Sequence, residues 1–196
     1  MEKDSLRKID LVLIGGSAGS LEVILRILPD LKKDLPFAII IIIHRKSSFE
    51  STLTALLASR TSWEVKEAEE KEDILPGIIY LAPADYHLLI EDDRTLSLDY
   101  SEKILHSRPA IDATFQTAAD VYKDKTAAFL LSGANADGSA GLKAIQQAGG
   151  LTIVQDPEEA EIKYMPAQAL SKMKPDYILS KYKMAELINQ LGNKSS

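Results

Sequence analysis

Short apolar runs alternate with longer amphipathic segments along most of the chain. The run "DLVLI" (10–14) predicts a strand, and segment 21–33 after it repeats apolar residues at the spacing of one helix face. The run "FAIIIII" (37–43) is almost continuously β-branched, which is typical of a strand buried on both faces. This alternation predicts βα units packed around a parallel sheet.

The same pattern continues to the end of the chain. Further helices are predicted over 49–60, 110–122, 137–150, 165–173 and 183–192, and further strands over 126–133, 151–156 and 176–180. Between 63 and 100 the apolar runs are shorter and rich in turn residues, which favours a short antiparallel excursion. We therefore predict an α/β fold in one domain over 1–196: a doubly wound, mostly parallel sheet with helices on both faces.

Composition and charge exclude several classes of partner and site. The chain of 196 residues has 23 Lys and Arg against 29 Asp and Glu, a net charge of -6, which argues against nucleic acid as a partner. The absence of cysteine excludes disulfides and thiolate sites. The first ten residues lack the apolar core of a signal peptide, and no apolar run is long enough to span a bilayer. We expect a cytoplasmic protein without membrane insertion.

Three polar residues follow predicted strands of the parallel sheet. Ser17 lies within "GGSAG" (15–19), which matches G-x-S-x-G, a strand-to-helix turn that exposes a serine hydroxyl. His44 ends the isoleucine run, and Asp137 follows the strand at 126–133. A serine needs a base to take its proton, and a histidine held by a carboxylate is suited to that task. The three residues together predict a Ser-His-Asp site at the carboxyl edge of the sheet.

Each residue also has a structural interpretation. The loop around Ser17 is also compatible with a phosphate-binding turn or a plain tight turn, although the dinucleotide pattern G-x-G-x-x-G is not met and no G-K-[ST] is present. His44 is equally compatible with a satisfied core histidine, and Asp137 with a helix cap. The agreement of all three at strand ends favours catalysis.

Six blocks of the sequence, in order, resemble the catalytic domain of the CheB family of chemotaxis protein-glutamate methylesterases. They are "IGGSAGS" (14–20), His44 after its β-branched run, "PGIIYLAPADYHLLI" (76–90), "SRPAIDATFQTAA" (107–119), "LSGANADGSAGLKAIQQAGG" (131–150) and "VQDPEEAEIKYMPAQAL" (154–170). The resemblance runs from the first predicted strand to about Leu170.

The resemblance implies a triad of Ser17, His44 and Asp137 that needs no cofactor and no metal. The implied reaction is hydrolysis of glutamyl methyl esters on the cytoplasmic helices of methyl-accepting chemoreceptors, with release of methanol, and deamidation of glutamine at the same sites. Three residues correspond to oxyanion or substrate-lining positions, through backbone or side chain: Ala18, Ala134 and Met165. For His87, Arg108 and Asp112 we favour structural roles: a histidine bonded to a loop, and an ion pair or helix start.

Several positions depart from the family pattern. Arg45 and Lys46 replace its Met-Pro after the histidine, Asn135 replaces a glycine, and Tyr164 replaces another. Two alternatives therefore stay open: a related serine esterase with a different substrate, and a non-catalytic regulatory module that retains the fold. The first strand begins too close to Met1 for the receiver domain that many members carry. We expect a chain that is ungated, regulated by a separate protein, or part of something larger.

Overall fold

Seven parallel strands form the central sheet, in the order β3-β4-β2-β1-β7-β8-β9. The computed structural model of the chain describes residues 8–45 and 50–192. The strands are β1 (Leu11–Gly16), β2 (Ala38–Ile43), β3 (Glu64–Glu67), β4 (Ile78–Leu81), β7 (Thr126–Leu130), β8 (Leu151–Gln155) and β9 (Tyr177–Leu179). The predicted doubly wound, mostly parallel sheet is confirmed.

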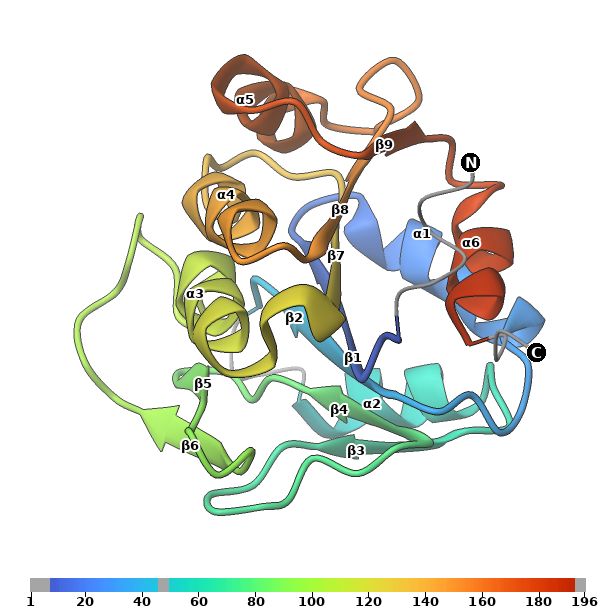
Figure 1. The fold of residues 1–196 in the computed structure, drawn as a ribbon, viewed down its shortest axis with the longest axis vertical. Helices are drawn as coiled ribbons and strands as arrows, with labels where there is room; N and C mark the ends of the chain where they lie inside the picture. Colours follow the sequence, from blue (N-terminus) through green and yellow to red (C-terminus); the bar gives the residue numbers. More distant parts are fainter. Residues whose placement is uncertain (1–7, 46–49, 193–196) are drawn as a thin grey trace.

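Helices cover both faces of this sheet, as Figure 1 shows. One face carries α1 (Ser20–Ile27), α2 (Glu50–Ala58) and α6 (Met184–Leu191), and the other carries α3 (Ile111–Tyr122), α4 (Ser139–Gln147) and α5 (Tyr164–Lys172). The longest of these helices, α3, has 12 residues, and none in the described part of the chain is long and apolar enough to cross a membrane.

The isoleucine run of β2 contributes side chains to the hydrophobic cores on both faces of the sheet. Ile39, Ile41 and Ile43 belong to the cluster under α1, α2 and α6, whereas Ile40 and Ile42 belong to the cluster under α3, α4 and α5. Successive side chains of a strand point to opposite faces, so a strand covered on both sides must be apolar at every position. This requirement explains why the run is continuous instead of alternating.

The antiparallel excursion is also confirmed, in a shorter form than 63–100. Among the described strands, β5 (His87–Ile90) and β6 (Leu96–Asp99) are the only antiparallel pair, and they form a separate two-stranded sheet against α3. The other two strands of that stretch, β3 and β4, join the edge of the main sheet in parallel. The expectation that these two belong to the antiparallel meander is wrong.

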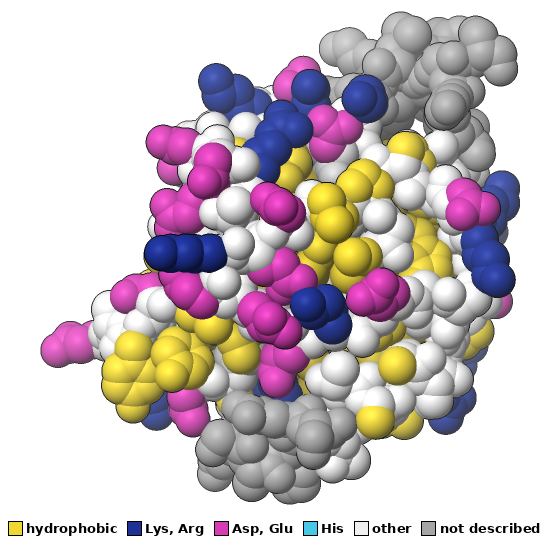
Figure 2. Space-filling view, turned by 90° about the horizontal axis from the view of Figure 1, so that it is seen from below, with side chains coloured by type: hydrophobic (Ala, Val, Ile, Leu, Met, Phe, Trp, Pro, Cys, Tyr) yellow, Lys and Arg dark blue, Asp and Glu magenta, His cyan; other side chains and the backbone are white. Residues whose placement is uncertain are grey.

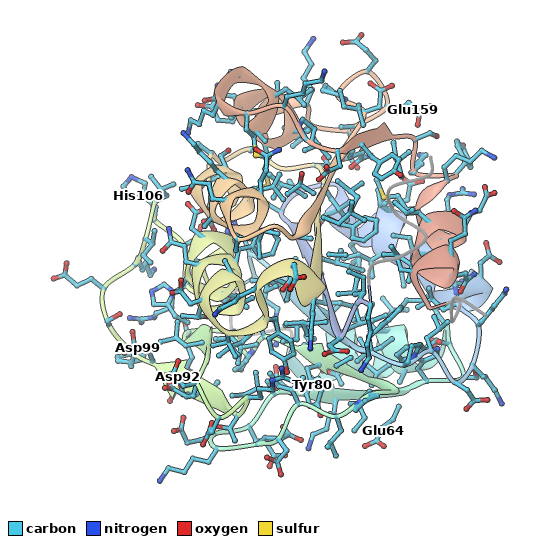
Figure 3. All side chains as sticks on the ribbon, viewed as in Figure 1. Glu64, Tyr80, Asp92, Asp99, His106 and Glu159 are labelled. Atoms are coloured by element: carbon cyan, nitrogen blue, oxygen red, sulfur yellow. The ribbon has the colours of Figure 1, made fainter. Side chains whose placement is uncertain are left out.

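The connection from β3 to β4 explains the difference. Residues 68–77 return along the sheet without a helix, so their sequence resembles a hairpin loop. The Lys71 N–H donates to the Leu96 carbonyl at 2.8 Å, which ties the connection to β6. The buried Tyr80, labelled in Figure 3, donates its hydroxyl to the Asp73 carbonyl at 2.8 Å. These contacts between distant segments hold the connection, and no local pattern predicts them.

Candidate active site

Ser17 lies in the turn that leads from the central strand β1 into α1. Its N–H donates to the Ser132 carbonyl at 2.9 Å, and its own carbonyl accepts from the Ser20 hydroxyl at 2.6 Å. Gly19 has a φ of 82°, in the left-handed region that favours glycine. The glycine and serine residues of the motif therefore close a tight turn that leaves Ser17 at the carboxyl edge of the sheet.

Gly133 brings a second loop against this turn. A Cβ at Gly133 would lie 2.9 Å from the Ser17 Cβ and 2.6 Å from the Met165 Cε, so only glycine fits there. The side chain of Met165 is fully buried. It packs against Gly133 and has no exposed surface with which to line the groove that the resemblance assigns to it.

Two exposed alanines flank Ser17 with free amides. Ala18 follows Ser17 directly, and Ala134 follows Gly133 in the adjacent loop. Within residues 8–45 and 50–192, neither backbone N–H makes a hydrogen bond. Unpaired N–H groups beside a nucleophile are the donors that an oxyanion needs.

His44 and Asp137 are in direct contact. The His44 Nε2 lies 2.6 Å from the Asp137 Oδ2. Asp137 is fully buried, and its carboxylate also accepts from the N–H groups of Ile111 at 2.6 Å and Asp112 at 2.8 Å, at the N-terminus of α3. Helix N-termini stabilise negative charge. A neutral His44 therefore carries its proton on Nε2 and presents the lone pair of Nδ1.

Parallel pairing brings Ser17 beside His44. Gly16 of β1 pairs with Ile43 of β2, and the His44 N–H donates to the Gly16 carbonyl at 3.2 Å. Neighbouring strands lie about 4.8 Å apart, so the residues that follow this pair are close neighbours. The Ser17 hydroxyl makes no hydrogen bond with any residue that the structure describes.

Ser107 is a further residue of this site, and the sequence pattern does not single it out. Its Oγ lies 3.2 Å from the His44 Nδ1, the ring nitrogen that Asp137 leaves free. Asn135 donates to the Leu105 carbonyl at 2.6 Å and accepts from the Asp137 N–H at 2.8 Å, so it joins the Ser107 loop to the Asp137 loop. The only signal in the sequence is that Ser107 directly precedes Arg108-Pro109 in a block used for the resemblance.

The remaining motif residues have structural partners. His87 is buried; its Nδ1 accepts from the Ala110 N–H at 3.2 Å and its Nε2 donates to the Glu102 carbonyl at 2.9 Å, which confirms the structural role. Arg108 donates to the Ser101 carbonyl at 2.7 Å and makes no described ion pair with Asp112, which instead lies in the first turn of α3. The helix-start alternative is therefore confirmed. Lys46 lies outside the described residues.

Two buried carboxylates link the N-termini of α3 and α4. Asp137 accepts from α3, and Asp112 of α3 accepts from the Gly141 N–H of α4 at 2.7 Å. Burial raises the pKa of Asp112 to about 6; the Gly141 N–H lowers it, and the charge of Asp137 adds to the increase. Among the described residues, no group of three or more His, Asp or Glu is placed to hold a metal ion.

Replacing Asp112 by asparagine should increase the free energy of unfolding, relative to that of the original chain, more at neutral pH than at acid pH. A carboxyl whose pKa rises on folding keeps its proton longer in the folded state, so its contribution to stability falls as pH rises from the unfolded value of 3.8 through about 6. Each pKa unit corresponds to about 1.4 kcal/mol. Asparagine retains the acceptor for Gly141 and cannot ionise.

Urea unfolding at pH 4 and pH 7 measures this difference. The free energy of unfolding of the variant minus that of the original chain should increase from pH 4 to pH 7. The exposed Asp120 of the same helix, replaced by asparagine, is the matched control and should give no such trend. An equal difference at both pH values for Asp112→Asn contradicts the prediction.

Comparisons with known proteins show what this chain is similar to. The family model described as CheB methylesterase matches residues 12–188. A protein of Leptospira interrogans is 43% identical over 180 residues, 92% of this chain and 93% of that protein. A Thermotoga maritima protein named protein-glutamate methylesterase/protein-glutamine glutaminase is 36% identical over 184 residues, 92% of this chain and 54% of that protein. The crystal structure of the Thermotoga maritima CheB methylesterase catalytic domain superposes with a TM-score of 0.90 at 35% identity, over 93% of this chain and 98% of that one. The chain therefore belongs to the CheB methylesterase family.

Proposed function

We propose that this chain hydrolyses glutamyl γ-methyl esters with a Ser17-His44-Asp137 triad. The observation that carries the proposal is the 2.6 Å contact between His44 and the buried Asp137, at the end of the strand next to Ser17. The names of the relatives support the same reaction and add deamidation of glutamine, an acyl transfer at the same kind of carbonyl carbon.

The proposed mechanism uses the Nδ1 of His44 as the base. Asp137 holds the proton on Nε2, so Nδ1 has the lone pair that can take the Ser17 proton. The hydroxyl of Ser107 occupies that lone pair in the resting structure and has to turn away first. Ser17 Oγ then attacks the ester carbonyl while its proton moves to His44, and Asp137 stabilises the imidazolium.

The negative charge on the carbonyl oxygen would be held by the N–H groups of Ala18 and Ala134, which make no hydrogen bond with any residue that the structure describes. Such donors contribute roughly 3 kcal/mol each in other acyl-transfer enzymes. The imidazolium returns the proton to the leaving methoxide, which departs as methanol. A water molecule then attacks the acyl-enzyme, with His44 again as base, and releases the glutamate and Ser17.

The proposed partners are the cytoplasmic helices of methyl-accepting chemoreceptors, with the reaction in the cytoplasm. Family membership is what supports this part of the proposal. A separate regulatory protein is a further proposed partner, and the whole chain is proposed to be one methylesterase domain.

Release of methanol from a peptide with a single glutamyl γ-methyl ester tests the proposal. The purified chain should release one methanol per ester, and the matching glutamine peptide should release ammonia more slowly. A fluorophosphonate probe should label Ser17, as found by mass spectrometry of the digested protein. The same peptide with free glutamate is the control and should release nothing.

Two other outcomes would replace this function. Hydrolysis of a nitrophenyl ester without methanol release would indicate a serine esterase with a different substrate. No hydrolysis of either ester, together with no labelling of Ser17, would indicate a non-catalytic regulatory module.

A further inference from the structure

A pocket of about 590 Å³ opens directly beside His44. Its lining contains three cationic side chains (Arg45, Lys103 and Arg108) and one carboxylate (Asp85), together with His44, His106 and Ser107. The chain as a whole has a net charge of -6. Figure 3 shows His106 at the outer tip of the loop between β6 and α3, which forms one wall of this pocket.

Acidic side chains gather on a different face. Figure 2 shows them in magenta on the side that lies below the sheet in Figure 1, and a second pocket is lined by Glu70, Glu91, Asp92 and Asp93 near the turn of β5 and β6. The pocket beside the proposed catalytic histidine therefore has more cationic than anionic lining residues, in contrast to the acidic pocket, which contains one lysine, Lys71. A pocket with an excess of positive charge attracts ligands of the opposite sign.

Arg45 has donors that no part of the described chain uses. Its side chain is 6% exposed, and its Nη2 donates to the Ala82 carbonyl at 3.1 Å and to the Glu67 carboxylate. Its Nε and Nη1 are buried without a hydrogen-bond partner among residues 8–45 and 50–192. A buried donor without an acceptor costs free energy. The contact with Glu67 holds the guanidinium in place, and its two remaining donors would be stabilised by an added acceptor.

Arg108 adds a positive charge without a counter-ion. Its guanidinium stacks on the Tyr100 ring at 3.9 Å, and its Nη1 donates to the neutral Ser101 carbonyl at 2.7 Å. Neither Arg108 nor Lys103 forms an ion pair with any described residue. His87 fixes the loop that carries both side chains through its contacts with Glu102 and Ala110. His87 therefore anchors the backbone at both ends of this loop.

We infer that this pocket is a carboxylate-binding subsite for an acidic residue that neighbours the ester in the substrate, with Arg45 as its specificity-determining residue. The unpaired Nε–H and Nη1–H of Arg45 point to different sides of the guanidinium, so each can donate to one oxygen of a carboxylate, and the charges of Arg108 and Lys103 add to the attraction. His44 lines the same pocket, so a bound carboxylate lies next to the reacting ester. This inference rests on the proposed function and adds a substrate class: esters within acidic polypeptide segments.

Three peptides test the inference. Each contains one glutamyl γ-methyl ester at the same position, and the residue next to the ester is glutamate in the first, glutamine in the second and lysine in the third. At low salt, kcat/KM for the glutamate peptide should exceed that for the glutamine peptide about tenfold, since a charged hydrogen bond contributes roughly 1.5–3 kcal/mol. The lysine peptide should be slowest, and the preference should shrink at high salt because screening weakens the attraction.

Variants assign the preference to Arg45. Arg45→Met should reduce the ratio of glutamate to glutamine peptide to near one. Arg45→Lys, which keeps the charge but loses the fixed direction of the guanidinium donors, should leave an intermediate ratio. Arg60→Met is the matched control, because Arg60 is an exposed arginine just after α2 and lines no part of this pocket. The control should retain the tenfold ratio. Equal rates for the two peptides in the original chain, or a ratio that survives Arg45→Met, would overturn the inference.

A binding measurement separates this inference from the proposed hydrolysis. Binding of fluorescent peptides without the ester to the Ser17→Ala protein is measured, so that no turnover is needed. The glutamate peptide should bind about tenfold more tightly than the glutamine peptide, and Arg45→Met in the same background should remove the difference. Tight acidic binding without any esterase activity would refute the proposed function and retain the subsite. Hydrolysis without an acidic preference would refute the subsite alone.

Discussion

Replacing Ser17 by alanine should lower kcat for methanol release about a million-fold. Deletion of the nucleophile of a serine protease triad has an effect of that order, because the whole covalent route is lost. The fold should persist, since the turn is held by backbone groups of Ser17 and by the Ser20 hydroxyl, none of which the substitution removes. Burst kinetics with a chromogenic ester measure the loss of activity, and circular dichroism measures whether the fold persists.

Ser107→Ala is the matched control for this substitution. It also removes a serine hydroxyl, in this case the one whose Oγ lies 3.2 Å from the His44 Nδ1. Because Ser107 only occupies the lone pair that Ser17 has to use, its loss should change kcat less than about tenfold, as expected for one neutral hydrogen bond. If Ser107→Ala were as inactive as Ser17→Ala, Ser107 would be required for the chemistry and the proposed assignment would need revision.

Replacing Asp137 by asparagine should lower kcat about ten-thousand-fold. The equivalent change in a serine protease has that effect because an amide no longer fixes the histidine in the required tautomer. Here the amide must also face the N–H groups of Ile111 and Asp112, so one donor is left without an acceptor. We expect an added loss of stability on the order of 1–3 kcal/mol.

The two effects of Asp137→Asn can be separated. Urea unfolding measures the loss of stability, and circular dichroism at the assay temperature gives the folded fraction by which kcat is corrected. Asp156→Asn is the matched control, because Asp156 follows the neighbouring strand β8 and its carboxylate accepts only from the exposed Glu158 N–H among described residues. It should leave kcat unchanged. Full activity of folded Asp137→Asn would contradict the triad.

Much of the fold follows from local patterns. The β-branched run of β2 and the amphipathic segments after each strand predict buried strands with helices on both faces, because burial on one or two faces imposes its own period on the sequence. The stretch 63–100 is the exception. Its strands β3 and β4 are parallel because residues 68–77 are held against β6 and Tyr80, and contacts of that kind leave no periodic signal.

The sequence by itself determined the α/β class, the edge of the sheet at which Ser17, His44 and Asp137 gather, and the family. Strand ends are local features, and parallel strands bring all their carboxyl ends to one edge. Only the tertiary structure decided which nitrogen of His44 faces Asp137, that Ser107 meets the other nitrogen, that Met165 is buried, and that Arg45 keeps donors free beside the site. Those features depend on side chains from segments 22 to 93 residues apart, whose packing is set by the assembled sheet and not by any neighbouring residue.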